Sequence, residues 1–128
     1  MTMEALVQKA IEVREKAYAP YSGFFVGAAA ENEHGQVFTG CNVENVSFGA
    51  TCCAERTAIF KAVSEGSKKI TKMAVVSQSK DYCLPCGICR QVMIEFAMPD
   101  FVLAAAASNG SYQVFSLDDL LPHAFKKL

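Results

Sequence analysis

Two cysteine clusters constrain the fold of this chain more than any other feature. The first reads Cys-Ala-Glu at positions 53–55, and the second reads Pro-Cys-Gly-Ile-Cys at positions 85–89. Three thiolates can hold a zinc ion and leave its fourth position for water, which is typical of a catalytic rather than a structural site. The fold must then bring Cys53, Cys86 and Cys89 to one point, with Glu55 beside them as an acid and base that is not a ligand.

The pair at positions 86 and 89 is less specific on its own. A Cys-x-x-Cys pair also suits a redox dithiol or half of a structural zinc knuckle. A knuckle needs a fourth ligand, and a regular helix cannot direct the adjacent Cys52 and Cys53 to the same ion. The Cys-x-Glu cluster therefore favours a catalytic zinc site.

We predict that Arg56 hydrogen-bonds one or two sulfurs and offsets their charge. We expect the remaining cysteines to be small buried hydrophobes: Cys41, Cys52 and Cys83.

Hydrophobic periodicity and turn residues predict the order αββαβαββα, a sheet sandwiched by helices. Thr2 is the expected N-cap of the first helix, Gly66 the C-cap of the second, and Ser116 the N-cap of the last. The expected helices cover residues 3–17, 53–65, 87–97 and 117–121, and the expected strands cover 24–30, 36–41, 70–77, 101–107 and 112–115.

Length and charge restrict the possible functions. A chain of 128 residues predicts one domain over residues 1–128. The net charge of −1, without a basic run, argues against a nucleic-acid substrate. No apolar stretch is long enough to span a membrane, and six cysteines without a secretory signal predict a cytoplasmic protein. A mean hydropathy of +0.19 suggests apolar surface buried between subunits.

Four motifs carry a resemblance over nearly the whole chain. They read YSGFFVGAA at 21–29, GCNVEN at 40–45, CAERTA at 53–58 and PCGICRQ at 85–91. In this order they resemble the motifs of the small homotetrameric zinc-dependent cytidine deaminase family. The resemblance implies an α/β fold, a three-layer α/β/α sandwich around a five-stranded mixed sheet. It also implies one zinc ion per subunit and a homotetramer with sites completed by neighbouring subunits.

The resemblance further implies roles for individual residues. Cys53, Cys86 and Cys89 would be the zinc ligands, and Glu55 would move protons. Asn42 and Glu44 would bind the ribose hydroxyls, although the segment 42–45 alone would suggest only a polar turn.

Aromatic residues and one backbone amide complete the implied substrate site. Phe24 would lie against the pyrimidine ring, although one aromatic residue in a strand more often packs in a core. The backbone N–H of Ala54 would help to orient the base. Phe125 would enter a neighbouring subunit's pocket. Phe48 stands where the family usually has tyrosine, so an aromatic contact survives there without the hydroxyl group.

The implied activity is hydrolytic deamination of cytidine and 2′-deoxycytidine to uridine and 2′-deoxyuridine, with release of ammonia, in pyrimidine salvage. The partner would be a small nucleoside, with neither nucleic acid nor membrane involved. Three alternatives stay open: a blasticidin-type aminonucleoside deaminase, a structural zinc-binding module and an RNA-editing deaminase. Arg56 and the pair Asn42 and Glu44 favour cytidine, and the lack of a basic groove disfavours RNA.

Overall fold

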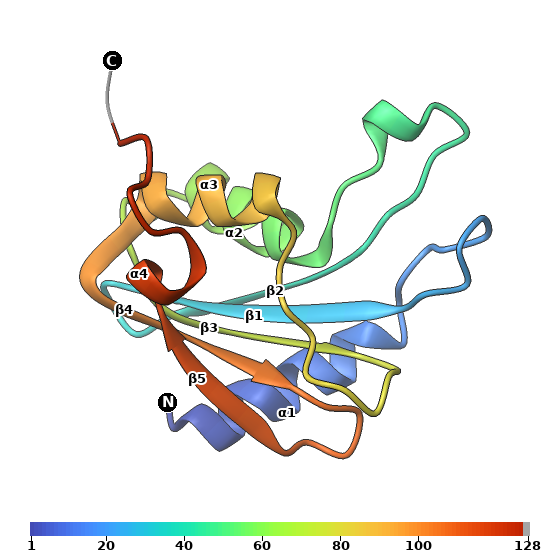
Figure 1. Ribbon diagram of the computed structural model, residues 1–128, viewed down its shortest axis with the longest axis horizontal. Helices are drawn as coiled ribbons and strands as arrows, with labels where there is room; N and C mark the ends of the chain where they lie inside the picture. Colours follow the sequence, from blue (N-terminus) through green and yellow to red (C-terminus); the bar gives the residue numbers. More distant parts are fainter. Residues whose placement is uncertain (127–128) are drawn as a thin grey trace.

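A five-stranded mixed sheet forms the centre of the computed structural model, which describes residues 1–126 (Figure 1). Its strands lie in the order β2-β1-β3-β4-β5. Strands β3 and β4 run parallel, and the other neighbouring pairs run antiparallel. The mixed sheet predicted from the sequence is therefore confirmed. The strands are β1 (Val26–Asn32), β2 (Val37–Cys41), β3 (Ile70–Ser77), β4 (Ala97–Ala106) and β5 (Tyr112–Ser116).

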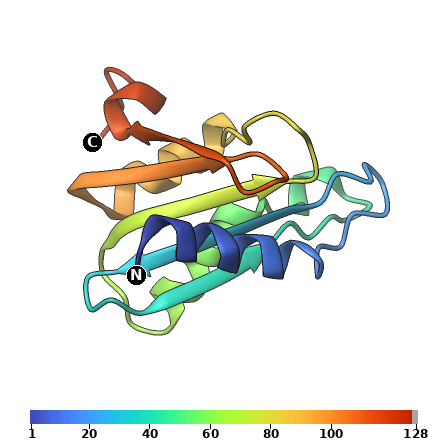
Figure 2. The same cartoon turned by 90° about the horizontal axis from the view of Figure 1, so that it is seen from below.

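Helices cover both faces of the sheet and make three layers. Helix α1 (Met3–Arg14) lies on one face, and α2 (Ala54–Ser64) and α3 (Gly87–Phe96) lie on the other (Figures 1 and 2). Every residue of β1 is buried, because its alternating side chains serve two cores. Ala28 packs in the core beneath α2, whereas Ala29 packs in the core beneath α1. The predicted sandwich is confirmed.

Both predicted N-caps are confirmed, whereas the C-cap of α2 is Glu65 rather than the predicted Gly66. The Thr2 hydroxyl accepts a hydrogen bond from the backbone N–H of Ala5 at 3.1 Å. Ser116 and Asp119 form a capping box at the start of the short helix α4 (Leu117–Leu120). Gly66 follows α2 with a φ of 102°, a left-handed conformation that favours glycine.

Several expected boundaries differ from the structure. Helix α1 ends at Arg14 rather than at residue 17, because the chain turns there so that Tyr18 can pair with Val43. Strand β1 begins at Val26 rather than at Phe24. The sequence also gave no signal for the 3₁₀ helix η1 (Phe48–Ala50).

Strand β4 begins at Ala97, four residues before the expected start. Its pairing with β3 shifts between Ile70 and Lys72, so the ladder passes from Ala97 directly to Val102. Proline cannot donate a ladder hydrogen bond, and this irregularity accommodates Pro99 inside a strand. Among residues 1–126, no helix combines the length and the apolar character needed to cross a membrane.

Two glycines allow the helices to lie unusually close to the sheet. A Cβ atom on Gly27 would lie 2.0 Å from the carbonyl oxygen of Ala10 in α1. A Cβ atom on Gly40 would lie 2.4 Å from the backbone nitrogen of Ala58 in α2. Both contacts are with backbone atoms, which cannot move without displacing a helix. The sheet thus holds α1 and α2 at distances that only glycine permits.

We expect Gly27→Ala to destabilise the protein by about 3 kcal/mol or more, because α1 must shift away from the sheet. Urea unfolding followed by circular dichroism measures the loss. Gly49→Ala is the matched control, since a Cβ atom there meets nothing within 4 Å and its φ is not positive. Equal stability of the two variants would contradict the close approach.

Candidate active site

The beginnings of α2 and α3 bring three thiols together. Cys53 is the N-cap of α2, Cys86 is the N-cap of α3, and Cys89 lies in the first turn of α3. Their Sγ atoms all lie within 4.8 Å of one another, and those of Cys53 and Cys86 are 3.8 Å apart. Helix N-termini carry partial positive charge, which stabilises thiolates. The convergence that the sequence predicts is therefore present.

This donor set suits a tetrahedral zinc ion. Zinc–sulfur bonds of about 2.3 Å place the sulfurs of a tetrahedron about 3.8 Å apart, which matches the spacing of Cys53 and Cys86. Cys52 is not part of this trio and pairs through its backbone with Val43. A fourth cysteine or histidine ligand is absent from the cluster among residues 1–126. The three cysteines fit a zinc ion with one open position.

Arg56 contacts the cluster as predicted. Its Nη2 donates to Sγ of Cys53 at 3.3 Å, while its buried Nε has no partner. A hydrogen bond from the Cys89 thiol and the guanidinium of Arg56 together lower the pKa of Cys53 to about 5. The same hydrogen bond, together with burial, raises the pKa of Cys89, so the proton of this pair stays on Cys89. Cys53 is therefore a thiolate at neutral pH even before a metal binds.

Glu55 lies in the first turn of α2 and is only 4% exposed. Burial, with a smaller contribution from the nearby Cys53 thiolate, raises the pKa of Glu55 to about 7. A carboxyl group with a pKa near neutrality can both take and return a proton. The environment of Glu55 is thus suited to general acid–base chemistry.

A cavity of about 290 Å³ opens beside the thiols and collects most of the predicted substrate residues. It is lined by Phe24, Asn42, Glu44, Ala54 and Glu55, together with Cys53 and Cys86. Cys89 is fully buried and does not line it. Predicted site residues from all four sequence motifs therefore surround one space.

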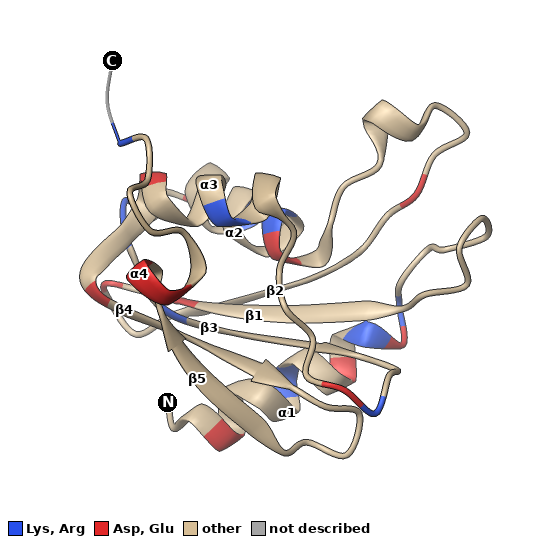
Figure 3. Ribbon diagram, viewed as in Figure 1, with Lys and Arg blue, Asp and Glu red and all other residues tan. Residues whose placement is uncertain are grey.

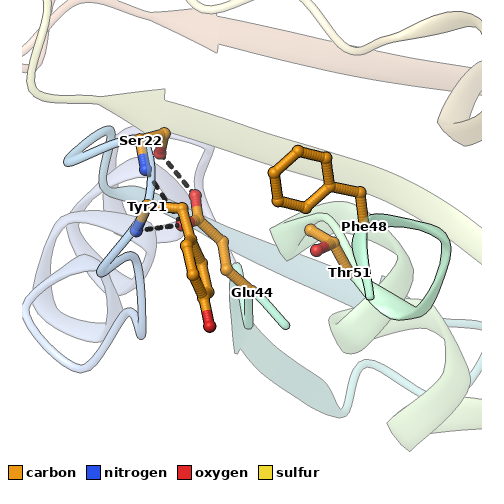
Figure 4. A pocket seen from close by; sticks show the side chains of 5 residues that line it. All are labelled: Tyr21, Ser22, Glu44, Phe48 and Thr51. Carbon is orange, nitrogen blue, oxygen red and sulfur yellow. Dashed lines mark hydrogen bonds between the residues drawn. The ribbon is translucent and has the colours of Figure 1, made fainter. Parts of the chain in front are cut away.

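A second cavity of about 330 Å³ adjoins the first and contains Phe48 (Figure 4). Ser22, Glu44 and Thr51 line both cavities, so the two adjoin, and together they are called the hollow. The ring of Phe48 lies 6.0 Å from the ring of Tyr21 in an edge-on arrangement. Phe48 is 75% exposed, so much of its ring can contact another molecule.

The two predicted sugar-binding residues are already held by the protein. Glu44 accepts hydrogen bonds from the backbone N–H groups of Tyr21 and Ser22, and from the Ser22 hydroxyl. The Ser22 hydroxyl is the main reason that the pKa of Glu44 is lowered. Asn42 donates to the carbonyl of Phe24 at 2.8 Å and accepts from the N–H of Val26 at 2.9 Å. Both side chains therefore have fixed orientations.

Phe125 lies outside both cavities of its own chain. Its side chain is 62% exposed, and its carbonyl oxygen accepts a hydrogen bond from Nε2 of Gln91 in α3 at 2.8 Å. This placement leaves the ring free to meet another molecule.

Some residues of the site were not expected from the sequence. Cys83, Leu84, Ser22 and Thr51 line the first cavity, and Tyr21 lines the second. Tyr21 and Ser22 belong to the first motif, but only the folded chain reveals that they bind Glu44. Three cysteines were expected to be buried but are only partly buried: Cys41, Cys52 and Cys83. Desolvation raises the pKa of Cys83 to about 12, so this thiol stays protonated.

Comparison with known proteins reveals relatives over the whole chain. Residues 1–105 match the family model described as the cytidine and deoxycytidylate deaminase zinc-binding region. A cytidine deaminase of Halalkalibacterium halodurans is 46% identical over 125 residues, which cover 98% of this chain and 95% of the relative. The crystal structure of a cytidine deaminase from Burkholderia pseudomallei is 49% identical, with a TM-score of 0.93 and coverage of 98% and 100% of the two chains. That of Mycobacterium tuberculosis is 38% identical, with a TM-score of 0.85 and coverage of 98% of both chains.

In the metal-free protein, we expect Cys53 to be alkylated by iodoacetamide already at about pH 6.5, because its pKa near 5 leaves it ionised there. Arg56→Gln removes a donor to the sulfur, so the pKa should rise and labelling should begin at higher pH. Mass spectrometry of labelled peptides follows each cysteine. Cys83 is the internal control and should stay unlabelled. An onset for Cys53 only above about pH 8, as for an ordinary thiol, would contradict the electrostatic account.

Proposed function

Because the chain belongs to the cytidine and deoxycytidylate deaminase family, we propose that it hydrolyses cytidine and 2′-deoxycytidine to uridine and 2′-deoxyuridine with release of ammonia. The relatives are cytidine deaminases, and the predicted enzyme class, a hydrolase of this type, is confirmed. The observation that carries the proposal is the buried Glu55 beside three converging thiols in a cavity of about 290 Å³. Such a volume suits one small ligand.

Cys53, Cys86 and Cys89 would hold one zinc ion per chain. When bound, the ion supplies Lewis acidity and makes water a nucleophile at neutral pH. Arg56 supports the cluster by donating to Cys53, which draws negative charge away from the sulfur. This contact counteracts the loss of Lewis acidity that three thiolates would cause.

Glu55 performs the proton transfers in this proposal. It accepts a proton from the attacking water and delivers it to the ring nitrogen next to the amine-bearing carbon. It then takes the remaining proton from the hydroxyl group that the water has added to this carbon and passes it to the departing amine, so that ammonia leaves and the uracil carbonyl forms. A pKa near 7 allows Glu55 to act as base and acid in turn.

Phe24, Asn42 and Glu44 would orient the nucleoside. The half-exposed ring of Phe24 offers a stacking surface for the pyrimidine, and the backbone N–H of Ala54 can contact the base. Asn42 and Glu44 would bind the sugar hydroxyls through the hydrogen-bonding capacity that their protein contacts leave free. Phe48 would add an apolar contact at the edge of the hollow.

Charge supports a nucleoside rather than a nucleotide or nucleic acid. Neither cavity has Lys or Arg among the described residues that line it, and both contain Glu44. Between Lys16 and Arg56 the chain carries no Lys or Arg, so the two loops at residues 17–25 and 42–53 hold no positive charge (Figure 3). A phosphate group would therefore meet a carboxylate without a compensating cation. Because the proposed substrates are free nucleosides, we propose that the enzyme takes part in pyrimidine salvage in the cytoplasm.

We further propose a homotetramer in which Phe125 completes a neighbour's site. Large apolar side chains are exposed near the hollow and at the C-terminal segment, notably Val46, Phe48 and Phe125. Exposed aromatic rings of this kind are typical of surfaces that associate. The positive mean hydropathy supports the same proposal.

We expect Glu55→Gln to keep its zinc but lose at least about 10³-fold in kcat, because the amide cannot move protons. Loss of the ultraviolet absorbance band of cytidine measures turnover, and a colorimetric dye measures zinc. Wild-type activity should also stop on chelation and return with zinc. Near-normal kcat in Glu55→Gln would refute the role of Glu55.

Turnover of blasticidin but not cytidine would assign the activity to the aminonucleoside deaminases, and zinc-dependent folding without any turnover would indicate a structural zinc site.

We expect Phe125→Ala to lower kcat/KM by about 10-fold or more while zinc content stays unchanged, because an aromatic contact to the substrate is lost. Analytical ultracentrifugation reports the assembly, and Phe60→Ala is a matched control on the outer part of α2, away from the cavities. A fully active monomer would contradict the shared site.

A further inference from the structure

We propose that Ser22 is a positioning residue that couples the two sides of the nucleoside site and thereby determines the affinity for the sugar hydroxyls. The inference rests on the proposed function, because it takes Glu44 as the group that binds the sugar and Phe24 as the ring that meets the base. Ser22 itself need not touch the substrate; it acts on binding by holding the carboxylate of Glu44 in place, whereas Phe24 keeps its hydrogen bond from Asn42 when the serine hydroxyl is removed.

One hydroxyl group makes this connection. Oγ of Ser22 donates to Oε2 of Glu44 and accepts from the backbone N–H of Phe24 at 3.0 Å. The other carboxylate oxygen, Oε1, accepts from the backbone N–H groups of Tyr21 and Ser22 at 3.0 and 3.1 Å. Figure 4 shows these bonds reaching Glu44 from one side. The loop that carries Phe24 is thus bonded directly to the carboxylate.

The local backbone explains how one serine can serve both partners. Gly23 has a φ of 66°, so the chain turns sharply between Ser22 and Phe24. This turn directs the N–H of Phe24 back to Oγ of Ser22, while the carbonyl of Phe24 accepts from Asn42 at 2.8 Å. Phe24 is therefore held from its N–H by Ser22 and from its carbonyl by Asn42.

The exposure of Ser22 indicates that its side chain positions other groups and does not pack in the core. Ser22 is exposed and lines the hollow, so its side chain fills no core space. A carboxylate offers about four acceptor positions, and the loop uses three of them, which leaves capacity for a sugar hydroxyl. A side chain fixed before binding loses less conformational freedom when the ligand arrives. Removal of the Ser22 hydroxyl should therefore weaken binding rather than chemistry.

Steady-state kinetics of Ser22→Ala test this role. We expect KM for cytidine to rise about tenfold, as for loss of one hydrogen bond to a charged group, while kcat changes less than about twofold. Ser22→Thr keeps the hydroxyl and should restore KM. With 2′,3′-dideoxycytidine, which lacks the 2′ and 3′ hydroxyls, wild type and Ser22→Ala should bind equally as measured by inhibition. Ser111→Ala removes an exposed hydroxyl at the β4–β5 turn, outside both cavities, and is the matched control.

Glu44→Gln separates failure of this inference from failure of the proposed function. If Glu44→Gln leaves KM for cytidine unchanged, Glu44 does not bind the sugar and the proposed site is wrong. If Glu44→Gln raises KM but Ser22→Ala does not, only the role of Ser22 is overturned. The double variant should be no worse than Glu44→Gln, because Ser22 acts through that carboxylate. Additive effects, an equal loss with dideoxycytidine, or no rescue by threonine would each overturn the inference.

Discussion

Three sulfur atoms converge at the N-termini of two helices, and this convergence dictates where both helices begin over the sheet. Cys53 and Cys86 cap α2 and α3, so both helices must begin at one point above the sheet. The partial positive charge of these helix ends and the guanidinium of Arg56 make the accumulated negative charge tolerable. Gly40 then fixes the height of α2 over β2, because any side chain there would push the helix outward.

The same small region shifts four ionisable groups in different directions. Hydrogen bonding from Cys89, with Arg56, lowers the pKa of Cys53, and burial raises those of Glu55 and Cys83. At the other side of the hollow, the Ser22 hydroxyl lowers the pKa of Glu44. Two carboxyl groups in one cavity therefore have different characters, Glu44 a fixed anion and Glu55 a group able to exchange a proton near neutral pH. Different surroundings thus give two carboxyl groups different pKa values and suit them to different chemical roles.

Local signals in the sequence predicted the elements and the thiol cluster, whereas features that depend on distant partners could not be predicted. Cap residues such as Thr2 and Ser116 act on their own helices, so their positions were correct. The early start of β4 depends on the irregular pairing with β3 that accommodates Pro99, and no local pattern encodes that pairing. The cavity wall formed by Cys83 and Leu84 likewise exists only because their loop folds over the site.

Asn42 and Glu44 illustrate why a polar turn and a binding site need not be alternatives. Both side chains hydrogen-bond the segment from Tyr21 to Val26, as a purely structural polar turn would. Those bonds consume only part of the capacity of an amide or a carboxylate, and they fix the rest in the direction of the cavity that both residues line. The structural role therefore creates the proposed binding role, because each group meets its ligand already oriented and loses little entropy on binding.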